Sequence, residues 1–440
     1  MTHLFKRSFL LAVALAAALL IGLACGDDDD DGEEETPAPT TGGATATPTG
    51  GPAEVDTDFG VSATEITLGL TIVQSGNLAA VYQPVAPAMT AYFAKVNEED
   101  GGVCERDIKL LVEDDQYSPA VALEKAKKLV EQDEILAFVG NLGTPAVTGQ
   151  VEYINAQEVP HLWVSTGASK WGDAATYPYT TGYIPDYTSE GKIFGTYLND
   201  NFAGKTVAAL YQNDDFGKNG LAGLKETLEA DIIAEQSYES VATDINSQLA
   251  ILRDANADIL YLYSTPAFTA KAFGYMKAND WKPQVVQGYV NSATQLASLV
   301  GGGTAPEQIQ AGFQAIAGAI SNNYILDPIA AVGDPAIVEH ARIMTEFGGP
   351  PLSTLSVYAQ SLAELVVETL QVACDSGDMT RAGVMAAAES IEAFAPSVLL
   401  PGIEINTSAT DHFAIQALLP VEIQADGVLK PLADEPISVE

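Results

Sequence analysis

The sequence predicts an α/β protein in which two doubly wound Rossmann-like lobes face a cleft. Short apolar strands alternate with amphipathic helices over most of the chain, which is typical of parallel sheets covered by helices. The strands are apolar along their whole length, which indicates that both faces of each sheet are covered. The same alternation starts again after about residue 186, so the chain contains two copies of one architecture.

The first copy begins the folded part of the chain. Its strands are expected at 66–73, 108–112, 135–139 and 161–164. Its helices are expected at 85–96, at 119–131 and from Thr144 onward. The helix at 119–131 has the clearest pattern, because its apolar residues recur every three or four positions and therefore share one face.

The second copy repeats this order. Its helices are expected at 189–198, 218–229, from 246, and at 267–277. Its strands are expected at 207–211, near 232, at 259–263 and at 285–286. From about Asp334 the pattern becomes mostly helical, with helices at 357–374 and 379–394. The tail at 399–439 alternates short apolar and polar stretches, which favours hairpin strands.

A candidate binding site follows the strand at 135–139. Gly140 to Gly143 free the backbone there, Thr144 suits a helix N-cap, and Pro145 suits the first helical position. Such a turn leaves several backbone N–H groups aimed at one point, which favours an anionic or strongly polar group. Thr144 as a cap and nothing more is the alternative.

The first 25 residues predict a targeting segment. Lys6 and Arg7 precede the apolar run Phe9–Leu20, and the segment ends at Cys25. A cysteine at the first mature position resembles a bacterial lipoprotein signal, with lipid attached to Cys25. Gly22 departs from the leucine usual in such signals, so an ordinary secretory peptide is the alternative.

Residues 26–59 predict a flexible tether. An acidic run is followed by Thr, Pro, Gly and Ala with almost no large apolar residue, and such a segment cannot bury enough surface to fold. The whole chain has 59 acidic and 20 basic residues and a formal net charge of −39. This balance makes nucleic acid and anionic membrane surfaces poor partners.

Neither a metal nor a cofactor is expected. Three cysteines and four scattered histidines give no metal-ligand spacing. The chain has no G-x-S-x-G elbow and no phosphate-binding loop, so we expect no enzyme. The adjacent acids Asp114 and Asp115 fit a loop or hinge better than acid–base catalysis. Cys104 and Cys374 form an even pair, which allows a disulfide.

Five short motifs carry a resemblance to a known family. They are Ser75-Gly76, Asp114-Asp115-Gln116-Tyr117, Gly140-Asn141, Thr166-Gly167-Ala168-Ser169 and Tyr211-Gln212-Asn213-Asp214-Asp215-Phe216-Gly217. In this order, with the stretch 400–408 near the end, they resemble the type I periplasmic binding proteins, in the leucine/isoleucine/valine-binding branch of ABC importers. The resemblance runs from about Ile66 to the C-terminus.

The resemblance implies a hinged two-lobed receptor outside the cytoplasm that delivers a small solute to an ABC permease. Lobe one would contain 60–184 and 314–395, and lobe two 185–313 and 396–440. It also implies a Cys104–Cys374 disulfide, with two free cysteines as the alternative. The N-terminal anchor would hold the protein on the lipid bilayer.

The resemblance also implies the ligand contacts. Thr144 falls where the family has a hydroxyl that touches the ligand carboxylate, and Ala168 and Ser169 compete for a second hydroxyl position. The full expected set is Thr144, Thr166, Gly167, Ala168, Ser169, Tyr187, Phe216, Thr265 and Tyr289. Phe216 is expected as an aromatic wall, with plain lobe packing as the alternative.

Tyr289 departs from the family pattern. Amino-acid-binding members usually have a glutamate there for the ligand ammonium, and Asp186, Asp214 or Asp215 would have to replace it. The expected ligand is a branched-chain amino acid or similar small carboxylate. The alternatives are an aromatic or other non-amino-acid carboxylate, or a ligand-sensing module for a signalling partner.

Overall fold

The computed structural model describes residues 55–76 and 78–438. The predictions for the targeting segment, for Cys25 and for most of the tether lie outside these residues. The end of the stretch predicted as a tether is described, and there β1 (Asp56–Thr57) pairs in parallel with β12 (Asp378–Met379).

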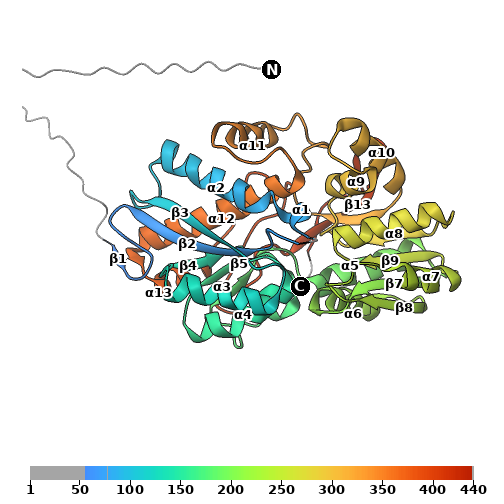
Figure 1. Cartoon of the computed structure of the whole chain (residues 1–440), viewed down its shortest axis with the longest axis horizontal. Coiled ribbons are helices and arrows are strands. Elements are labelled where there is room, and N and C mark those ends of the chain that lie inside the picture. The colour runs from blue at the N-terminus through green and yellow to red at the C-terminus, as the bar shows by residue number, and fades with distance from the viewer. Residues whose placement is uncertain (1–54, 77, 439–440) are drawn as a thin grey trace, which may run out of the picture. The chain divides into compact units, whose positions relative to one another are not determined.

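A five-stranded parallel sheet forms the core of the first copy, in the order β3-β2-β4-β5-β6. The strands are β2 (Glu65–Ile72), β3 (Asp107–Asp114), β4 (Ala137–Val139), β5 (His161–Val164) and β6 (Thr180–Gly182). The helices between them are α1 (Ala79–Tyr82), α2 (Val85–Lys95), the π-helix Val96–Asp100, α3 (Pro119–Glu131), α4 (Thr144–Ala156) and the 3-10 helix Ser169–Gly172. In Figure 1, α3 and α4 lie on the opposite side of this sheet from α2.

An eight-stranded sheet forms the core of the second copy, in the order β14-β13-β11-β10-β9-β7-β8, with β15 also paired to β13. The strands are β7 (Val207–Gln212), β8 (Ile232–Tyr238), β9 (Ile259–Tyr263), β10 (Gln284–Gln287), β11 (Ile320–Asn323), β13 (Ala417–Ile423), β14 (Leu429–Pro431) and β15 (Ile437–Ser438). The helices are α5 (Tyr187–Asn201), α6 (Asp215–Thr227), α7 (Asn246–Asp254), α8 (Pro266–Ala278), α9 (Ala293–Gly301) and α10 (Pro306–Ile316).

The two sheets share one topology. Strand β2 lies between β3 and β4, and β7 lies in the same way between β8 and β9. In each sheet the second strand is added on one side of the first strand and the third on the other side. Ligands of open α/β sheets bind at the carboxyl ends of the strands next to such a switch in strand order. The last strands β13, β14 and β15 add antiparallel pairs to the second sheet. The predicted doubly wound fold and the hairpin tail are confirmed. The residue limits expected for the two lobes stay a prediction.

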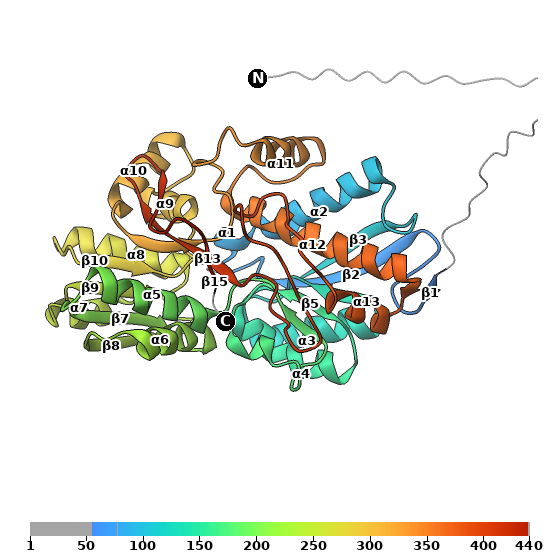
Figure 2. The same cartoon turned by 180° about the vertical axis from the view of Figure 1, so that it is seen from behind.

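The long helix α12 (Thr354–Ser376) returns to the first sheet. It packs on α2 and β5, and α13 (Arg381–Ala388) packs beside it, while α11 (Pro335–Glu346) contacts α2 (Figures 1 and 2). The Trp163 indole N–H of β5 donates to the Thr369 hydroxyl of α12 at 3.1 Å. A segment from late in the chain therefore covers a sheet built from its first part.

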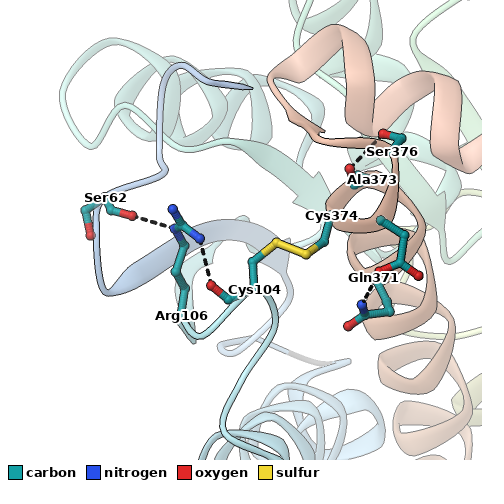
Figure 3. Close-up of a disulfide and its surroundings, with 8 residues drawn as sticks. Ser62, Cys104, Arg106, Gln371, Ala373, Cys374 and Ser376 are labelled. Atoms are coloured by element: carbon teal, nitrogen blue, oxygen red, sulfur yellow. Dashed lines mark hydrogen bonds between the residues drawn. A yellow bond between two sulfur atoms is a disulfide. The ribbon is translucent and has the colours of Figure 1, made fainter. Parts of the chain in front are cut away.

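A disulfide joins Cys104, in the turn before β3, to Cys374 near the end of α12 (Figure 3). This is the pairing that the family resemblance implies. The two Cα atoms are 5.9 Å apart, a usual separation for a disulfide. Arg106 braces the same turn, since its guanidinium donates to the carbonyls of Ser62 and Cys104 (Figure 3).

Several of the expected helices begin or end at other residues than predicted, and hydrogen bonds explain the difference in two of them. The helix expected at 379–394 is α13 and ends at Ala388, because the N–H groups of Ile391 and Ala393 donate to the side chains of Thr407 and Asn406 instead of continuing it. The helix expected at 357–374 starts earlier, at Thr354, where Ser353 caps it by accepting from the Ser356 N–H. Helices α9 and α10 were not predicted.

Candidate functional site

A pocket lies where the carboxyl ends of both sheets meet α12. From the first sheet and the loops that follow its strands come Tyr82, Tyr117, Leu142, Gly143, Thr144, Ser165 and Ile184. From the second sheet and its loops come Tyr187, Phe216, Thr265, Tyr289, Val290, Ser292 and Asn323. The remaining lining residues are Tyr324, Ile325, Thr354, Leu355 and Tyr358.

The described residues that line this pocket include no Asp, Glu, Lys, Arg or His. Six of them are tyrosines, namely Tyr82, Tyr117, Tyr187, Tyr289, Tyr324 and Tyr358. Burial raises the pKa of every one of these phenols, that of Tyr187 to about 12. At neutral pH the wall therefore consists of neutral aromatic, aliphatic, hydroxyl and amide groups.

Three helices start in the pocket wall without a side-chain cap. Their N-cap residues are Gly143 for α4, Thr265 for α8 and Ser292 for α9. Helix N-termini carry free N–H groups and a partial positive charge, and here no cap satisfies them. The pocket therefore offers hydrogen-bond donors to an acceptor or an anion.

Thr144 and Thr166 form a hydroxyl corner at the start of α4. Their hydroxyl oxygens are 2.6 Å apart, both side chains are buried, and the Trp171 indole N–H donates to Thr166 at 3.4 Å. The prediction that Thr144 is an N-cap is wrong, because Gly143 holds that position with φ 100° and Thr144 is the first helical residue. The Thr144 hydroxyl therefore does not cap the helix, and Thr144 lines the pocket.

The aromatic residues of the second sheet form one continuous wall. The Tyr187 ring lies 4.9 Å from Phe216 and 6.0 Å from Tyr289, and Tyr289 lies 5.4 Å from Tyr324. Tyr289 is fixed at both ends, since its hydroxyl donates to the Pro185 carbonyl at 2.5 Å and its backbone N–H to Glu190 at 2.7 Å. An apolar or aromatic ligand surface fits against such a wall.

Five of the nine residues expected at the site line the pocket: Thr144, Tyr187, Phe216, Thr265 and Tyr289. Thr166, Gly167, Ala168 and Ser169 lie behind them. Gly167 permits a close approach, because a Cβ there would stand 2.8 Å from the Tyr289 hydroxyl and 2.1 Å from the Pro185 carbonyl oxygen. The Ser169 hydroxyl hydrogen-bonds to the Thr188 hydroxyl at 2.7 Å, and Ser169 does not line the pocket. Ala168 is fully buried.

The acids considered as ammonium partners stand outside the wall. Asp186 caps α5, Asp214 caps α6, and Asp215 pairs with Lys170 at 2.7 Å. A further acid, Glu190, was missed by sequence reasoning. It is fully buried and accepts from the Tyr263 hydroxyl, the Tyr289 N–H and the Asn322 amide. Burial raises the pKa of Glu190 to about 8, against the effect of those hydrogen bonds.

Sequence reasoning also missed the part of the wall that comes from α12 and from the segment after β11. Thr354, Leu355 and Tyr358 occupy the first turns of α12. Asn323 is the last residue of β11, and Tyr324 and Ile325 follow it. Only the capping residue Ser353 and the amphipathic pattern marked this helix in the sequence, and neither shows that its N-terminus points at the cleft.

Contacts on either side of the pocket join the two halves. Besides the Lys170–Asp215 pair, the Gln295 amide of α9 donates to the Val81 carbonyl of α1 at 2.9 Å. The Ser169 N–H donates to the Asn219 side chain of α6 at 3.1 Å. Elements of the two halves are therefore in direct contact beside the pocket.

Residues 55–76 and 78–438 hold no cluster of three or more His, Cys, Asp or Glu side chains that could bind a metal ion. Among the same residues, every helix is too short or too polar to cross a bilayer.

The family profile described as periplasmic binding protein matches residues 65–428. The chain therefore belongs to this family, which confirms the resemblance to the periplasmic binding proteins. A curated relative, the amino acid binding protein of Pseudomonas aeruginosa, is 25% identical over 172 residues, which are 37% of this chain and 44% of the relative. The chain thus spans less than half the length of this relative.

Solved structures show the same fold at low identity. A branched-chain amino acid ABC transporter protein of Thermus thermophilus with bound valine has a TM-score of 0.75 at 19% identity, over 86% of this chain and 97% of that one. A fatty acid ABC transporter substrate-binding protein of Thermomonospora curvata has a TM-score of 0.73 at 22% identity, over 88% and 95%. A solute-binding protein of Rhodopseudomonas palustris in complex with 3,4-dihydroxy benzoic acid has a TM-score of 0.68 at 19% identity, over 85% and 97%.

Proposed function

We propose that this periplasmic binding protein captures a small carboxylate with an apolar or aromatic body and without an α-ammonium group. The family match supports binding without chemical conversion of the solute. The ligand's carboxylate would sit at the N-termini of α4, α8 and α9 and at the Thr144 hydroxyl, and its body would lie on the tyrosine wall.

One observation carries this proposal: none of the described residues that line the pocket has a charged side chain. An anion needs none, because backbone N–H groups at helix N-termini and hydroxyl groups can hold it. An ammonium group buried in the same wall would lack a carboxylate partner, and an unpaired buried charge costs several kcal/mol. The glutamate usual at this place in amino-acid-binding members is Tyr289 here, and its phenol is occupied by the Pro185 carbonyl.

A branched-chain amino acid is the second candidate. Valine is bound in the Thermus thermophilus protein of the same fold. In its favour, Asp327 lies directly behind Thr354 of the pocket wall, whose hydroxyl donates to it at 3.2 Å. An amino acid would have to displace that hydroxyl to reach the carboxylate.

Pairs of ligands that differ only in the ammonium group separate the two candidates. We expect calorimetry to give at least about tenfold tighter binding, or 1.4 kcal/mol, for 4-methylpentanoate over leucine and for 3-phenylpropanoate over phenylalanine. If leucine bound more tightly than 4-methylpentanoate, the lining would not set the preference in this way. If none of the four bound, the carboxylate assignment itself would fail.

The wider setting completes the proposal. The two lobes would close on the solute by a hinge and present it to an ABC permease. Lipid on Cys25 and the part of the segment 26–59 that precedes β1 would keep the receptor tethered to the membrane on the extracytoplasmic side. Mass spectrometry of the intact protein from membranes tests the lipid, and a mass without a diacylglyceryl group would remove the anchor.

A further inference from the structure

A second, smaller cavity adjoins the ligand pocket behind Tyr289. It shares four lining residues with the pocket: Tyr289, Ser292, Asn323 and Thr354. Its other walls come from Ala293, Ser321, Asn322, Asp327, Val421, Ile423 and Leu429. We call this cavity the polar annex. The cavity volume of the annex is about 10 Å³, whereas that of the main pocket is about 90 Å³. The annex therefore has room for one water-sized group.

Two buried oxygen atoms in the annex have no hydrogen-bond partner among the described residues. They are the Ser292 hydroxyl and the side-chain carbonyl oxygen of Asn322. The orientation of Asn322, which is 4% exposed, is set on its other side, where its amide N–H donates to Glu190 at 3.2 Å. Turning the amide over would place its oxygen against Glu190 Oε1, which already accepts from the Tyr289 N–H, so the carbonyl oxygen belongs on the annex side.

Asp327 adds a fixed acceptor to the same cavity. It is 4% exposed, and one of its oxygens accepts from the Thr294 hydroxyl at 2.8 Å and from two backbone N–H groups. The other oxygen accepts from the Thr354 hydroxyl at 3.2 Å and retains acceptor capacity. The annex is therefore lined by acceptors, whereas the helix N-termini of the main pocket offer donors.

A buried acceptor without a partner costs about 1–3 kcal/mol, and a donor that reaches it recovers that cost. A methyl group in the annex would leave Asn322 and Ser292 unsatisfied, and a hydroxyl group of the same size would satisfy one or both. A site built to bind a hydroxyl also rejects an analogue that lacks it.

We propose that the polar annex binds a hydroxyl substituent of the ligand, so that the solute is a hydroxylated carboxylate. This inference rests on the proposed function, because the carboxylate end of the same molecule lies in the main pocket. The annex thus binds the hydroxyl substituent, and the helix N-termini bind the carboxylate of the same ligand.

Ligand pairs in which hydroxyl replaces methyl test the inference. The probes are 4-hydroxybenzoate against 4-methylbenzoate, the corresponding 3-substituted pair, and 3-(4-hydroxyphenyl)propanoate against 3-(4-methylphenyl)propanoate. Calorimetry on the unaltered protein is expected to show at least about tenfold tighter binding of the hydroxyl member in one of these pairs.

Variants of α9 locate the preference. Ser292→Ala is expected to reduce the hydroxyl-to-methyl affinity ratio to about threefold or less, and Ser292→Val, which fills the annex, to bring it to one or reverse it. Ser298→Ala is the matched control, since Ser298 lies on the same helix and its hydroxyl donates to the Gly303 carbonyl away from the pocket. Thermal unfolding checks that each variant is folded.

Each outcome decides one question. Equal binding of hydroxyl and methyl members in every pair, or an unchanged ratio in Ser292→Ala, would show that the annex holds a structural water only, and the inference would be overturned while the carboxylate assignment stands. Failure of all six acids to bind would instead remove the proposed function on which the inference depends.

Discussion

Replacement of Thr144 by valine tests the hydroxyl corner of the pocket. Valine keeps the shape of threonine and removes only the hydroxyl, which lies 2.6 Å from the hydroxyl of Thr166. Thr166 still accepts from the Trp171 indole, so the free protein loses one buried neutral hydrogen bond. We expect the free energy of unfolding to fall by about 1 kcal/mol.

The loss on ligand binding is larger if the hydroxyl contacts the carboxylate. A hydrogen bond to a charged group contributes about 1.5–3 kcal/mol, so the dissociation constant should rise about 10- to 150-fold. Calorimetry with the tightest-binding carboxylate measures this change, and urea unfolding without ligand measures the stability change.

Thr90→Val is the matched control for Thr144→Val. The Thr90 hydroxyl donates to the Ala86 carbonyl within α2, and Thr90 does not line the pocket. Its dissociation constant should stay within about twofold of that of the unaltered protein, because no ligand contact changes. A Thr144→Val protein that lost stability but bound the ligand as tightly as before would show that the hydroxyl serves the fold alone, and the reasoning would be refuted.

Three further predictions concern buried charge, closure and the disulfide. Burial raises the pKa of Glu190 to about 8, above its unfolded value, so its contribution to stability is fully present below pH 4.5 and is lost as the pH rises through 8. Glu190→Gln should flatten that fall in urea unfolding between pH 5 and 9, and an unaltered slope would contradict the assignment. The Lys170–Asp215 pair is half-exposed and contributes at most about 1 kcal/mol to closure, so Lys170→Met should speed ligand release by up to about fivefold in stopped-flow measurements at low salt. Asp215→Asn and the double variant should release the ligand at the same rate as Lys170→Met. If the two single changes added up in the double variant, the two side chains would act separately. Replacing Cys104 and Cys374 by serine should lower the free energy of unfolding by about 2–5 kcal/mol, and an unmoved urea midpoint would mean that the bridge does not restrain the unfolded chain.

The parallel sheets could be predicted from the sequence because each strand is a short apolar run between turn residues. His161–Val164 and Ile259–Tyr263 have the limits expected. Helices α9 and α10 escaped prediction, although both have an apolar face. The end of α13 also could not be predicted, because side chains of Thr407 and Asn406 from another segment decide it.

The site was predicted in part for a similar reason. Residues that follow strands closely, such as Phe216 at the start of α6 and Thr265 before α8, lie at the pocket because strand ends fix their place. Thr354 and Tyr358 reach it through the packing of α12 on the first sheet, and Glu190 reaches Tyr289 through the packing of α5. Contacts between elements so far apart in the chain leave no local mark on the sequence.

The covering of the first sheet by α12 also determines the order in which this protein can mature. The strands of that sheet are complete by Gly182, whereas the helix that seals its apolar surface begins at Thr354. A nascent chain released between these points would expose that surface, and strand β13, which pairs with β11 in the other sheet, would still be missing as well. Splitting the gene after residue 184 would therefore yield two fragments that depend on each other for solubility, and a chaperone that shields the early half has a physical reason to act on this chain.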